Sequence, residues 1–395
     1  MRKIKKIGLI AVGDEGWQGG IQYIINIIGA LDAIADQDPV ELHLFKKPTQ
    51  KFDELNRFKR LDIRVHDLES ELEPWTFANR VRWFAQRKVG GRFYPRLEDY
   101  LLRNQFDYVF PATLSDCNRK LNTGSWIADF QYRHFPDGAS NAVNESADRV
   151  ISFIAHNTSK IILSSRFCES DSWHFFPVTR GKTHVMPFAV SLDKGIFDFH
   201  DFDGVRNKYS LSERFLIVSN LFAPTKNHKT LFNALGLLKD RGIKVDLVCT
   251  GNIVDYRNQL YANEILQVIT DNKIRNQVHL LGLIPRADQL ALYRMSVAMV
   301  QPSINEGWST PVEEAKALGK NLILSDIDVH KEQFPDNSFF FRSNDAEDLA
   351  EVVKKVWERT EGVSFPEIET EQMAVAAYEE KIREFGRRFL EIGRL

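Results

Sequence analysis

Two glutamates eight residues apart, Glu306 and Glu314, lie in the stretch of sequence richest in groups able to bind a ligand. The stretch follows an apolar run that ends at Gln301, and its second half carries helix signals. Open α/β sheets place ligands at the carboxyl ends of their strands. Carboxylates there can accept hydrogen bonds from sugar hydroxyls, while free backbone N–H groups in a helix's first turn attract phosphate.

The residues around Glu314 predict where its helix begins and ends. Thr310 is expected at the N-cap, Pro311 at the first helical position and Glu313 at the third, which together form a capping box. Gly319 is expected just past the last turn, where a left-handed residue ends a helix. Glu313 therefore has a structural explanation, whereas Glu314, about 100° further around the helix, has none.

Lys226 stands just before a second predicted helix, which begins after Asn227. The helix dipole disfavours a cation at this end, so an anionic ligand sharing the site is one explanation and a solvated loop lysine is the other. A glycine-rich turn that includes Gly19 and Gly20 follows the first apolar run. It fits anion binding and a plain strand–helix turn equally well, because it is not a GxGxxG fingerprint.

Short apolar runs alternate with helical stretches along most of the chain, which predicts βαβ units. The runs are continuous rather than alternating, as in parallel strands covered on both faces. The expected strands are Ile4–Val12, Val40–Phe45, Ile63–His66, Tyr108–Pro111, Trp126–Ala128, Lys160–Leu163, His184–Pro187, Phe215–Ser219, Val245–Thr250, Val278–Leu281, Ala298–Gln301, Asn321–Leu324 and Phe339–Phe341. After Asn227, apolar residues at helical spacing predict a buried helix face, formed by Leu231, Ala234, Leu235 and Leu238.

A turn-rich segment near 190–213 divides the chain into two halves that each begin with a strand, a turn and a helix. The predicted fold class is α/β, with two doubly wound Rossmann-like domains facing a cleft. The first domain is expected at 1–195 and the second at 196–370. Residues 371–395 are expected to form a charged C-terminal helix.

Composition excludes several classes of protein. The chain has 395 residues, 43% of them hydrophobic and 27% charged, which is typical of a soluble globular protein and not of a disordered chain or a collagen. A net charge of -2 argues against a nucleic-acid-binding polycation. Three widely spaced cysteines indicate neither a disulfide framework nor a zinc site and fit a reducing compartment. No apolar run is long enough for a transmembrane helix, so we expect a cytoplasmic protein, with peripheral attachment to the inner membrane face left open.

These motifs together resemble the family-4 retaining glycosyltransferases, which have the GT-B fold. Glu306 to Glu314 resembles their Glu-x7-Glu signature, and Lys226-Asn227-His228 is similar to their phosphate-binding lysine. Gly19-Gly20 fits their glycine loop, and Trp126-Ile127-Ala128-Asp129-Phe130-Gln131 resembles a Trp-Ile-Pro-Asp-Phe-Gln-His segment of a bacterial branch. The resemblance covers most of 120–360 and is strongest at 215–330.

The resemblance implies transfer of a sugar, with retention, from a nucleotide-diphosphate donor to a glycan or lipid-linked acceptor. Surface polysaccharide or lipopolysaccharide synthesis in bacteria is the implied setting. The first domain would hold the acceptor and the second the donor, and the final helix would cross back to the first domain. No metal and no cofactor are implied, since the nucleotide sugar is a substrate.

The same resemblance implies roles at the donor side. Glu314 would bind the ribose hydroxyls, Glu306 would hold hydroxyls of the transferred sugar, and Lys226 would neutralise the departing diphosphate. Backbone N–H groups in the glycine loop and around Thr310, Pro311 and Val312 would add to donor binding.

Two departures from the family pattern leave roles open. Asn220 stands where many members have an arginine, and Arg286 is a candidate substitute. Ala128 stands where the family often has a histidine, so for the residue that faces the reacting sugar Asp129 is the first candidate and Gln131 the second. A loop-capping role for Asp129 is the alternative.

Two further motifs have competing interpretations. Asp326-Ile327-Asp328 matches a metal-binding Asp-x-Asp, but Asp326 is expected instead to cap a helix that begins near Val329. Residues 79–97 form a basic segment with interleaved aromatic side chains, which would bind anionic lipid headgroups or a phosphorylated acceptor, or form a solvated helix face. Its candidate contact residues are Arg82, Arg87, Lys88 and Arg92.

Two other functions stay open at this point. One is a nucleotide-sugar epimerase or hydrolase of GT-B fold, which would act without an acceptor. The other is a non-catalytic module that only binds a nucleotide sugar.

Overall fold

The computed structural model describes residues 4–14, 17–72, 76, 81, 95–112, 121–136, 140–199, 201–254, 260–333 and 337–395. The chain divides into two compact units. The first unit comprises Met1–Phe130, Glu145–Ser191 and Glu379–Leu395, and the second comprises Gln131–Asn144 and Leu192–Tyr378.

The strands lie close to where the continuous apolar runs predict them. They are β1 (Lys6–Ile10), β2 (Glu41–Lys46), β3 (Asp62–Asp67), β4 (Tyr108–Phe110), β5 (Ser125–Ile127), β6 (Ile161–Leu163), β7 (Thr183–Val185), β8 (Leu216–Ser219), β9 (Leu247–Thr250), β10 (Val278–Gly282), β11 (Ala298–Gln301), β12 (Leu322–Ser325) and β13 (Ser338–Phe341). Each expected strand overlaps one of these, so the prediction of strand positions is confirmed.

Helices follow most of the strands along the chain. They are α1 (Gln18–Ile34), α3 (Pro95–Arg103), α4 (Gln131–His134), α5 (Asn141–Asn157), α6 (Arg166–Phe175), α7 (Phe202–Lys208), α8 (His228–Asp240), α9 (Tyr261–Asp271), α10 (Arg286–Met295), α11 (Thr310–Ala317), α12 (Asp328–Gln333), α13 (Ala346–Arg359) and α14 (Ile368–Arg394). A short 3₁₀ turn, η6 (Pro224–Lys226), precedes α8. Alternation of strand and helix gives the right-handed crossovers that parallel sheets require.

The first unit is built on parallel strands in the order β3-β2-β1-β4, beside a second parallel set in the order β5-β6-β7. A parallel bridge between Val109 and Thr123 connects the two sets. One face of the sheet packs against α3, through a core that includes Phe45, Leu97 and Leu101. The strand order reverses direction between β1 and β4, which makes this a doubly wound arrangement.

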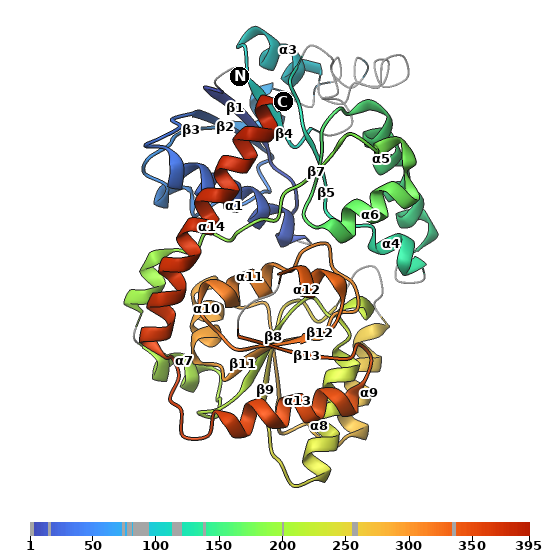
Figure 1. Ribbon diagram of the computed structural model, residues 1–395, viewed down its shortest axis with the longest axis vertical. Helices are drawn as coiled ribbons and strands as arrows, with labels where there is room; N and C mark the ends of the chain where they lie inside the picture. Colours follow the sequence, from blue (N-terminus) through green and yellow to red (C-terminus); the bar gives the residue numbers. More distant parts are fainter. Residues whose placement is uncertain are drawn as a thin grey trace. The chain divides into compact units, whose positions relative to one another are not determined.

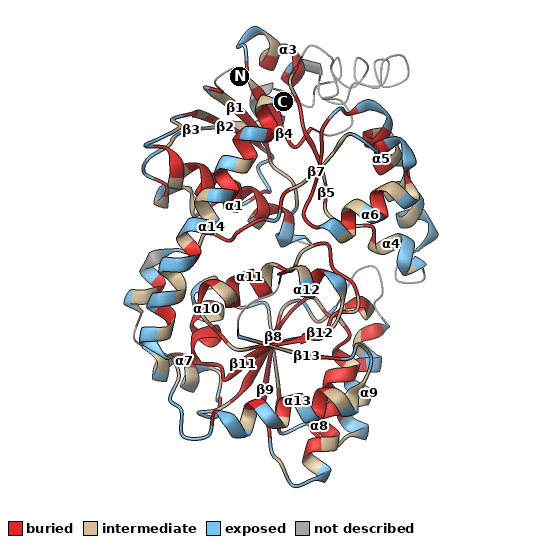
Figure 2. Cartoon of the chain, viewed as in Figure 1, coloured by how far each residue is buried: buried red, intermediate tan, exposed pale blue. Residues whose placement is uncertain are grey.

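The second unit has a single six-stranded parallel sheet in the order β10-β9-β8-β11-β12-β13. Helices α8, α9 and α13 cover one face, and α7, α10 and α11 cover the other, each with its own buried cluster (Figure 1). Figure 2 shows the strands as a buried layer inside helices with exposed outer faces. The residues predicted to form the apolar face of α8, Leu231 to Leu238, are buried. Because β8 and β11 flank the point where strand order reverses, their carboxyl ends are where a ligand is expected.

The α/β prediction with two Rossmann-like domains is therefore confirmed. The expected C-terminal helix is also present as α14, whose residues up to Tyr378 belong to the second unit and whose later residues belong to the first. Within the first unit, α14 approaches α1 so closely that a Cβ on Gly386 would lie 2.4 Å from the Ala30 carbonyl oxygen. Glycine at 386 thus permits a contact that a larger residue would block.

A buried ion pair anchors the start of α14 in the second unit. The Arg294 guanidinium donates to Glu371 at 3.0 Å and to the carbonyl oxygens of Ile196 at 2.6 Å and Phe199 at 3.2 Å. Arg294 is 1% exposed and Glu371 is 2% exposed. Burial of both charges is tolerated only while each keeps its partners.

Arg294→Met should lower the free energy of unfolding by about 3–5 kcal/mol, because it leaves Glu371 buried without its cation. The exposed Arg387, which pairs with Glu380 on the surface of α14, provides the control. Arg387→Met should cost less than about 0.5 kcal/mol. Denaturant unfolding of both variants measures this difference, and equal stabilities would contradict the proposed anchoring role.

Candidate functional site

Lys226 and Glu306 form an ion pair at the carboxyl edge of the second unit's sheet. Lys226 ends η6, which follows β8, and Glu306 lies in the loop that follows β11. The Lys226 ammonium nitrogen is 2.6 Å from Glu306 Oε1. The carboxylate is almost fully buried and the lysine side chain is 21% exposed. Lys226 and Glu306 are 80 residues apart in the sequence, and they meet because β8 and β11 are neighbours in the sheet.

Two amides at the ends of these strands hold Glu306 in place. Asn220 follows β8 and Gln301 ends β11, and their side-chain amides exchange hydrogen bonds at 2.9 and 3.2 Å. Gln301 Nε2 also donates to Glu306 Oε1 at 2.9 Å. Asn220 therefore positions the site through Gln301 and brings no positive charge to it. The site at this edge is assembled by hydrogen bonds across the sheet's switch point.

Glu314 is also paired, although with a different cation. Arg286, at the start of α10, donates to the Glu314 carboxylate, which is 3% exposed. Arg286 also donates to Gln289 at 2.8 Å, and Gln289 donates to Ser219 Oγ at 2.6 Å. Ser219 ends β8 and is next to Asn220 in the chain, so the two ion pairs meet around one strand end. This supports Arg286 as the second cation of the candidate site.

The pKa of Glu306 lies below its ordinary value despite burial. Burial by itself raises the pKa of a carboxyl group, but here the charge and hydrogen bond of Lys226 outweigh it, with smaller contributions from His330 and Ser303. Glu306 is therefore an acceptor-only carboxylate at neutral pH. A polar ligand that binds there must supply hydrogen-bond donors.

His330, in α12, is a site residue that sequence reasoning missed. Its Nδ1 lies 3.0 Å from both the hydroxyl and the carbonyl oxygen of Ser325. Its Nε2 is buried and has no hydrogen-bond partner within the described ranges. Burial lowers the pKa of His330 to about 4, and the charge of Glu306 partly opposes that shift. A lone histidine in an unremarkable helix gives no sequence signal, because its place beside Glu306 depends on the β12–α12 connection.

The start of α11 differs from the prediction. Ser309, not Thr310, occupies the N-cap position, and no side chain caps the helix there, so the expected capping box is wrong. Glu313 instead accepts hydrogen bonds from Tyr378 at 2.6 Å, Lys316 at 2.8 Å and Gln333 at 2.9 Å. Tertiary partners compete successfully with the local cap because the Glu313 side chain is buried. The structural role of Glu313 stands, although its partners lie on α11, α12 and α14.

Other expectations for this helix agree with the structure. Gly319 has a φ of +63° just after the last turn, as a C-terminal stop requires. Thr310, Pro311 and Val312 form the first turn, before the first intrahelical bond from Glu313 N–H to Ser309. Pro311 has no N–H to offer, so the backbone donors of this turn are those of Thr310 and Val312. Roles for these groups in donor binding stay a prediction.

The lysine also has a structural setting that the sequence only partly predicts. Asn227 has a φ of +53°, a left-handed conformation that asparagine tolerates better than most residues, and it turns the chain from η6 into α8. His228 follows as the first residue of α8 and stacks on Phe222 at 4.0 Å. It is fully buried, and neither ring nitrogen has a partner among the residues the structure covers.

The remaining predicted site residues are placed as follows. Gly19 and Gly20 lie in the first turn of α1 and not in a turn before it. A Cβ on Gly20 would lie 2.9 Å from the Gly13 backbone, so close packing alone requires glycine there. Asp129 is half-buried after β5, and Gln131, in α4, donates to the Asn305 carbonyl oxygen at 3.2 Å, next to Glu306.

Several expectations concern residues outside this site. Arg82, Arg87, Lys88 and Arg92 lie outside the described residues, so their contacts stay a prediction. Asp326 does not cap α12, because its carboxylate accepts from the Ser343 N–H and hydroxyl at 2.9 Å. Within the described ranges, no cluster of three His, Cys, Asp or Glu residues is arranged to hold a metal ion. None of the helices within the same ranges has the length and apolarity to cross a membrane.

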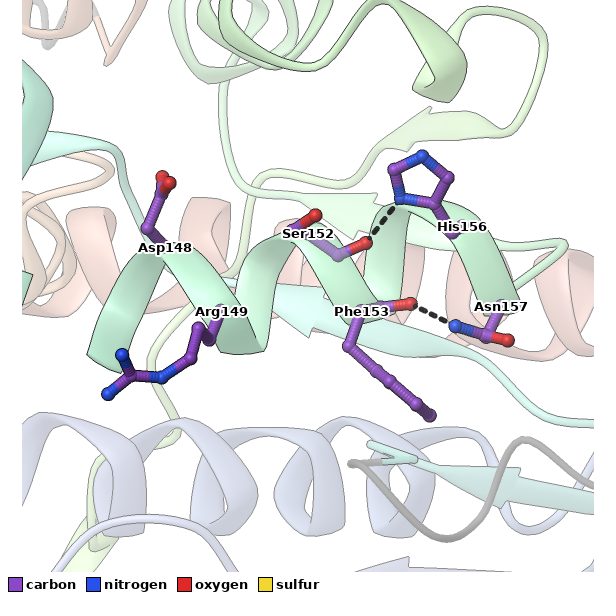
Figure 3. A pocket seen from close by; sticks show the side chains of 6 residues that line it. All are labelled: Asp148, Arg149, Ser152, Phe153, His156 and Asn157. Atoms are coloured by element: carbon purple, nitrogen blue, oxygen red, sulfur yellow. Dashed lines mark hydrogen bonds between the residues drawn. The ribbon is translucent and has the colours of Figure 1, made fainter. Parts of the chain in front are cut away.

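A shallow cavity of about 450 Å³ lies along α5 in the first unit (Figure 3). Its lining comes from one helix, and two of its polar side chains bond to carbonyls of that helix. His156 bonds the Ser152 carbonyl oxygen and Asn157 donates to that of Phe153. The cavity therefore lacks polar groups that converge from different elements, as ligand sites have.

Part of the sequence and the whole fold match known proteins. Residues 202–375 match the family described as "Glycosyl transferases group 1". The structure matches that of a glycosyltransferase from Rickettsia africae over 100% of this chain and 98% of that one, with a TM-score of 0.67 and 16% identity. HepE of Anabaena, solved with UDP and glucose, matches over 98% of each chain with the same TM-score and identity. The chain thus has the GT-B fold.

Two curated proteins are distant relatives by sequence. The O-antigen chain mannosyltransferase RfbU of Salmonella typhimurium is 27% identical over 104 residues, which are 26% of this chain and 30% of RfbU. The serotype-specific mannosyltransferase WbdA of Escherichia coli is 24% identical over 193 residues, 48% of this chain and 23% of WbdA. The chain therefore spans about a quarter to a third of the length of the curated relatives it matches.

Burial of His228 predicts a pH-dependent stability. Burial, aided by the Lys226 charge, lowers its pKa from 6.5 to about 3. Below pH 6.5 the unfolded chain therefore binds a proton that the folded protein does not, so stability falls as the pH falls from 6.5 towards 3. Between pH 7.5 and 5.0 this residue alone should cost about 2 kcal/mol.

His228→Phe keeps a ring against Phe222 and should remove the part of the stability loss that His228 causes. The comparison is between unfolding free energies at pH 7.5 and pH 5.0. His156→Phe, at an exposed position on α5, should leave the loss unchanged. An undiminished loss in His228→Phe would show that the buried ring does not cause it.

Proposed function

We propose that the protein is a retaining glycosyltransferase that moves a hexosyl group from a nucleotide-diphosphate donor to a glycan or lipid-linked acceptor. The observation that carries the proposal is the joint placement of Lys226, Glu306 and Glu314 at the switch point of the second sheet. One ammonium and two carboxylates there match the charges and hydroxyls of an activated sugar. The match of residues 202–375 to the group 1 family supports the same conclusion.

Partner exchange explains how charged groups can be buried in the free protein and still bind a donor. Lys226 neutralises Glu306, and Arg286 neutralises Glu314, so neither carboxylate is left buried and unpaired. A diphosphate that binds at this edge would draw Lys226 away from Glu306. Glu306 and Gln301 would then hold hydroxyls of the sugar, while Glu314 accepts from those of the ribose.

Lys226 would then act where negative charge develops. As the bond between the anomeric carbon and the diphosphate breaks, charge builds on the phosphate oxygens and positive charge builds on the sugar ring. A positioned cation stabilises the negative charge on the phosphate oxygens. The Glu306 carboxylate, which lies close to Lys226, would favour the positive charge on the sugar ring. The chain's own residues thus supply the electrostatics, and the proposal includes no metal or cofactor.

The relatives suggest where the protein acts and which donor to test first. RfbU and WbdA are named as mannosyltransferases, and a structural match with TM-score 0.59 is WaaG, a glycosyltransferase involved in lipopolysaccharide biosynthesis. We therefore propose a role in surface polysaccharide or lipopolysaccharide synthesis, with GDP-mannose and UDP-glucose as first donors. The proposed acceptor-binding part is the first unit.

Lys226→Ala should lower the affinity for the nucleoside diphosphate about 100-fold and the transfer rate by about 10²–10³, because the leaving diphosphate loses its cation. Lys229→Ala is the matched control, since Lys229 lies three residues on and pairs with Glu264 at the surface. Titration calorimetry and initial rates measure both effects. If Lys226→Ala binds and transfers like Lys229→Ala, the assignment of Lys226 fails.

Loss of Lys226 also leaves Glu306 buried and unpaired, so reduced stability must be separated from reduced binding. Lys226→Met combined with Glu306→Gln removes both charges. This double variant should recover the unfolding free energy that the single variant loses. It should not restore binding or transfer. Recovery of transfer in the double variant would show that the lysine acts only through folding.

The adjacent glutamates give a second test. Glu314→Ala should weaken nucleotide binding about 10- to 100-fold, because hydrogen bonds to a charged acceptor contribute about 1.5–3 kcal/mol. Glu313→Ala should reduce stability, since it removes the acceptor for Tyr378, Lys316 and Gln333, but it should leave nucleotide affinity within threefold. Calorimetry and denaturant unfolding of the two variants would refute the assignment if Glu313→Ala lost more affinity than Glu314→Ala.

An acceptor-free reaction separates transfer from the alternatives. A time course of the donor followed by proton NMR should show slow or no consumption until an acceptor is added, and then a product of unchanged anomeric configuration. Rapid acceptor-independent release of nucleotide would favour an epimerase or hydrolase.

A further inference from the structure

Trp17 is a partly exposed aromatic residue at the start of α1, and helix capping does not account for it. It occupies the N-cap position of α1, where serine, asparagine or aspartate would stabilise the helix, and its side chain makes no capping bond. The residue is 47% exposed, so only part of its large side chain is buried. Single exposed apolar residues are common on protein surfaces, so what distinguishes Trp17 is the arrangement of the rings beside it.

The ring of Trp17 belongs to an ordered stack in the first unit. It lies parallel to Trp126 of β5, with 5.8 Å between ring centroids and 7° between planes. Trp126 in turn stacks on Tyr23 at 3.9 Å, and Tyr23 is buried in the core against Phe188. Trp126 Nε1 is 3.3 Å from Ser164 Oγ at the end of β6. The stack thus runs from the core to an exposed outer ring.

The backbone holds the outer ring in place. Trp17 N–H donates to Asp14 Oδ1 at 3.0 Å, and Gln50 secures the same loop by donating to the Gly13 carbonyl oxygen at 2.7 Å. Gly19 lies under the indole, because a Cβ there would be 3.3 Å from Trp17 Nε1. Little conformational entropy remains to be lost when a ligand contacts a ring held this way.

The position of the stack favours a ligand at the carboxyl edge of the sheet. Trp17 follows β1, which is the strand at the point where the order β3-β2-β1-β4 changes direction. An aromatic face carries partial negative charge, and the C–H groups on one face of a pyranose ring carry partial positive charge. A flat, partly exposed indole that stacks on a second ring at this edge therefore suits a sugar ring.

We propose that Trp17, supported by Trp126 and Tyr23, is a stacking platform for a pyranose ring of the glycan acceptor. The proposal rests on the transfer function proposed above and names the residue that binds its second substrate. Trp17 contacts the acceptor through its indole ring, whereas any contact of Gly19 and Gly20 with the donor uses backbone N–H groups that substitution of Trp17 keeps. Substitution of Trp17 therefore affects glycan binding and leaves nucleotide binding unchanged.

The test uses the full chain and a panel of short oligosaccharides of mannose, glucose, galactose and N-acetylglucosamine at millimolar concentration. Saturation-transfer NMR is recorded for wild type, Trp17→Ala, Trp17→Phe and Val65→Ala, the last at an exposed apolar position of β3 in the same unit. At least one oligosaccharide should bind wild type and Val65→Ala equally. Trp17→Ala should weaken that binding at least tenfold, and Trp17→Phe should retain most of it.

Thermal shifts with GDP and UDP, measured on the same four proteins, distinguish this proposal from the proposed function. Equal thermal shifts in all four proteins, together with glycan binding that is lost only in Trp17→Ala, support both the stacking platform and the proposed function. Equal shifts with glycan binding unchanged in Trp17→Ala, or with no panel member bound by wild type, overturn the platform alone. Absence of any nucleotide shift in wild type counts against the proposed function instead.

A membrane role for the exposed ring is the competing outcome. Sedimentation with phosphatidylglycerol-containing vesicles should be the same for wild type and Trp17→Ala. Loss of vesicle binding in Trp17→Ala, with glycan binding unchanged, would overturn the proposal in favour of lipid contact.

Discussion

The burial of opposite charges at the carboxyl edge of one parallel sheet is the constraint on which the candidate site depends. Glu306 is almost fully buried, so its charge is tolerable only with a cation and hydrogen-bond donors close by. The neighbouring positions of β8 and β11 supply both, since Lys226 and Asn220 follow one strand while Gln301 ends the other. Arg286 and Glu314 form a second ion pair at this edge, so its charged groups are paired in the free protein. In the proposed function a nucleotide-diphosphate sugar would replace both pairings, with the diphosphate at Lys226 and the ribose hydroxyls at Glu314.

Glu313 and Glu314 are neighbours in the chain whose side chains have different partners. They point about 100° apart on α11. Glu313 faces Tyr378 and Gln333 and ties α14 and α12 to the helix. Glu314 pairs with Arg286, whose side chain is 31% exposed, and it also interacts with the buried Tyr293. A partner that is partly in solvent can be displaced by a ligand more readily than one enclosed in a core.

Sequence patterns predicted the architecture well because the relevant signals are local. Continuous apolar runs mark strands that are covered on both faces, and helical spacing at Leu231 to Leu238 marks the face of α8 that packs on them. Gly319 was predictable because a helix that ends in a left-handed residue favours glycine. The Glu306–Lys226 contact was predictable only from the strand-end positions and the family resemblance.

What the sequence could not predict depends on packing between distant segments. The capping box at Thr310 failed because Glu313 found stronger partners on α12 and α14, which lie outside any local window. The cap expected at Asp326 failed for a similar reason, since Ser343 comes beside it through the pairing of β12 with β13. The pairing of Arg286 with Glu314, the place of His330 and the stack under Trp17 likewise arise from tertiary contacts between separate elements.

The most direct measurement of the central claim is a crystal structure with a nucleoside diphosphate bound. The account predicts that Lys226 Nζ leaves Glu306 for a phosphate oxygen and that the Glu314 carboxylate accepts from the ribose hydroxyls. A diphosphate bound elsewhere, with the Lys226–Glu306 and Arg286–Glu314 pairs unchanged, would contradict it.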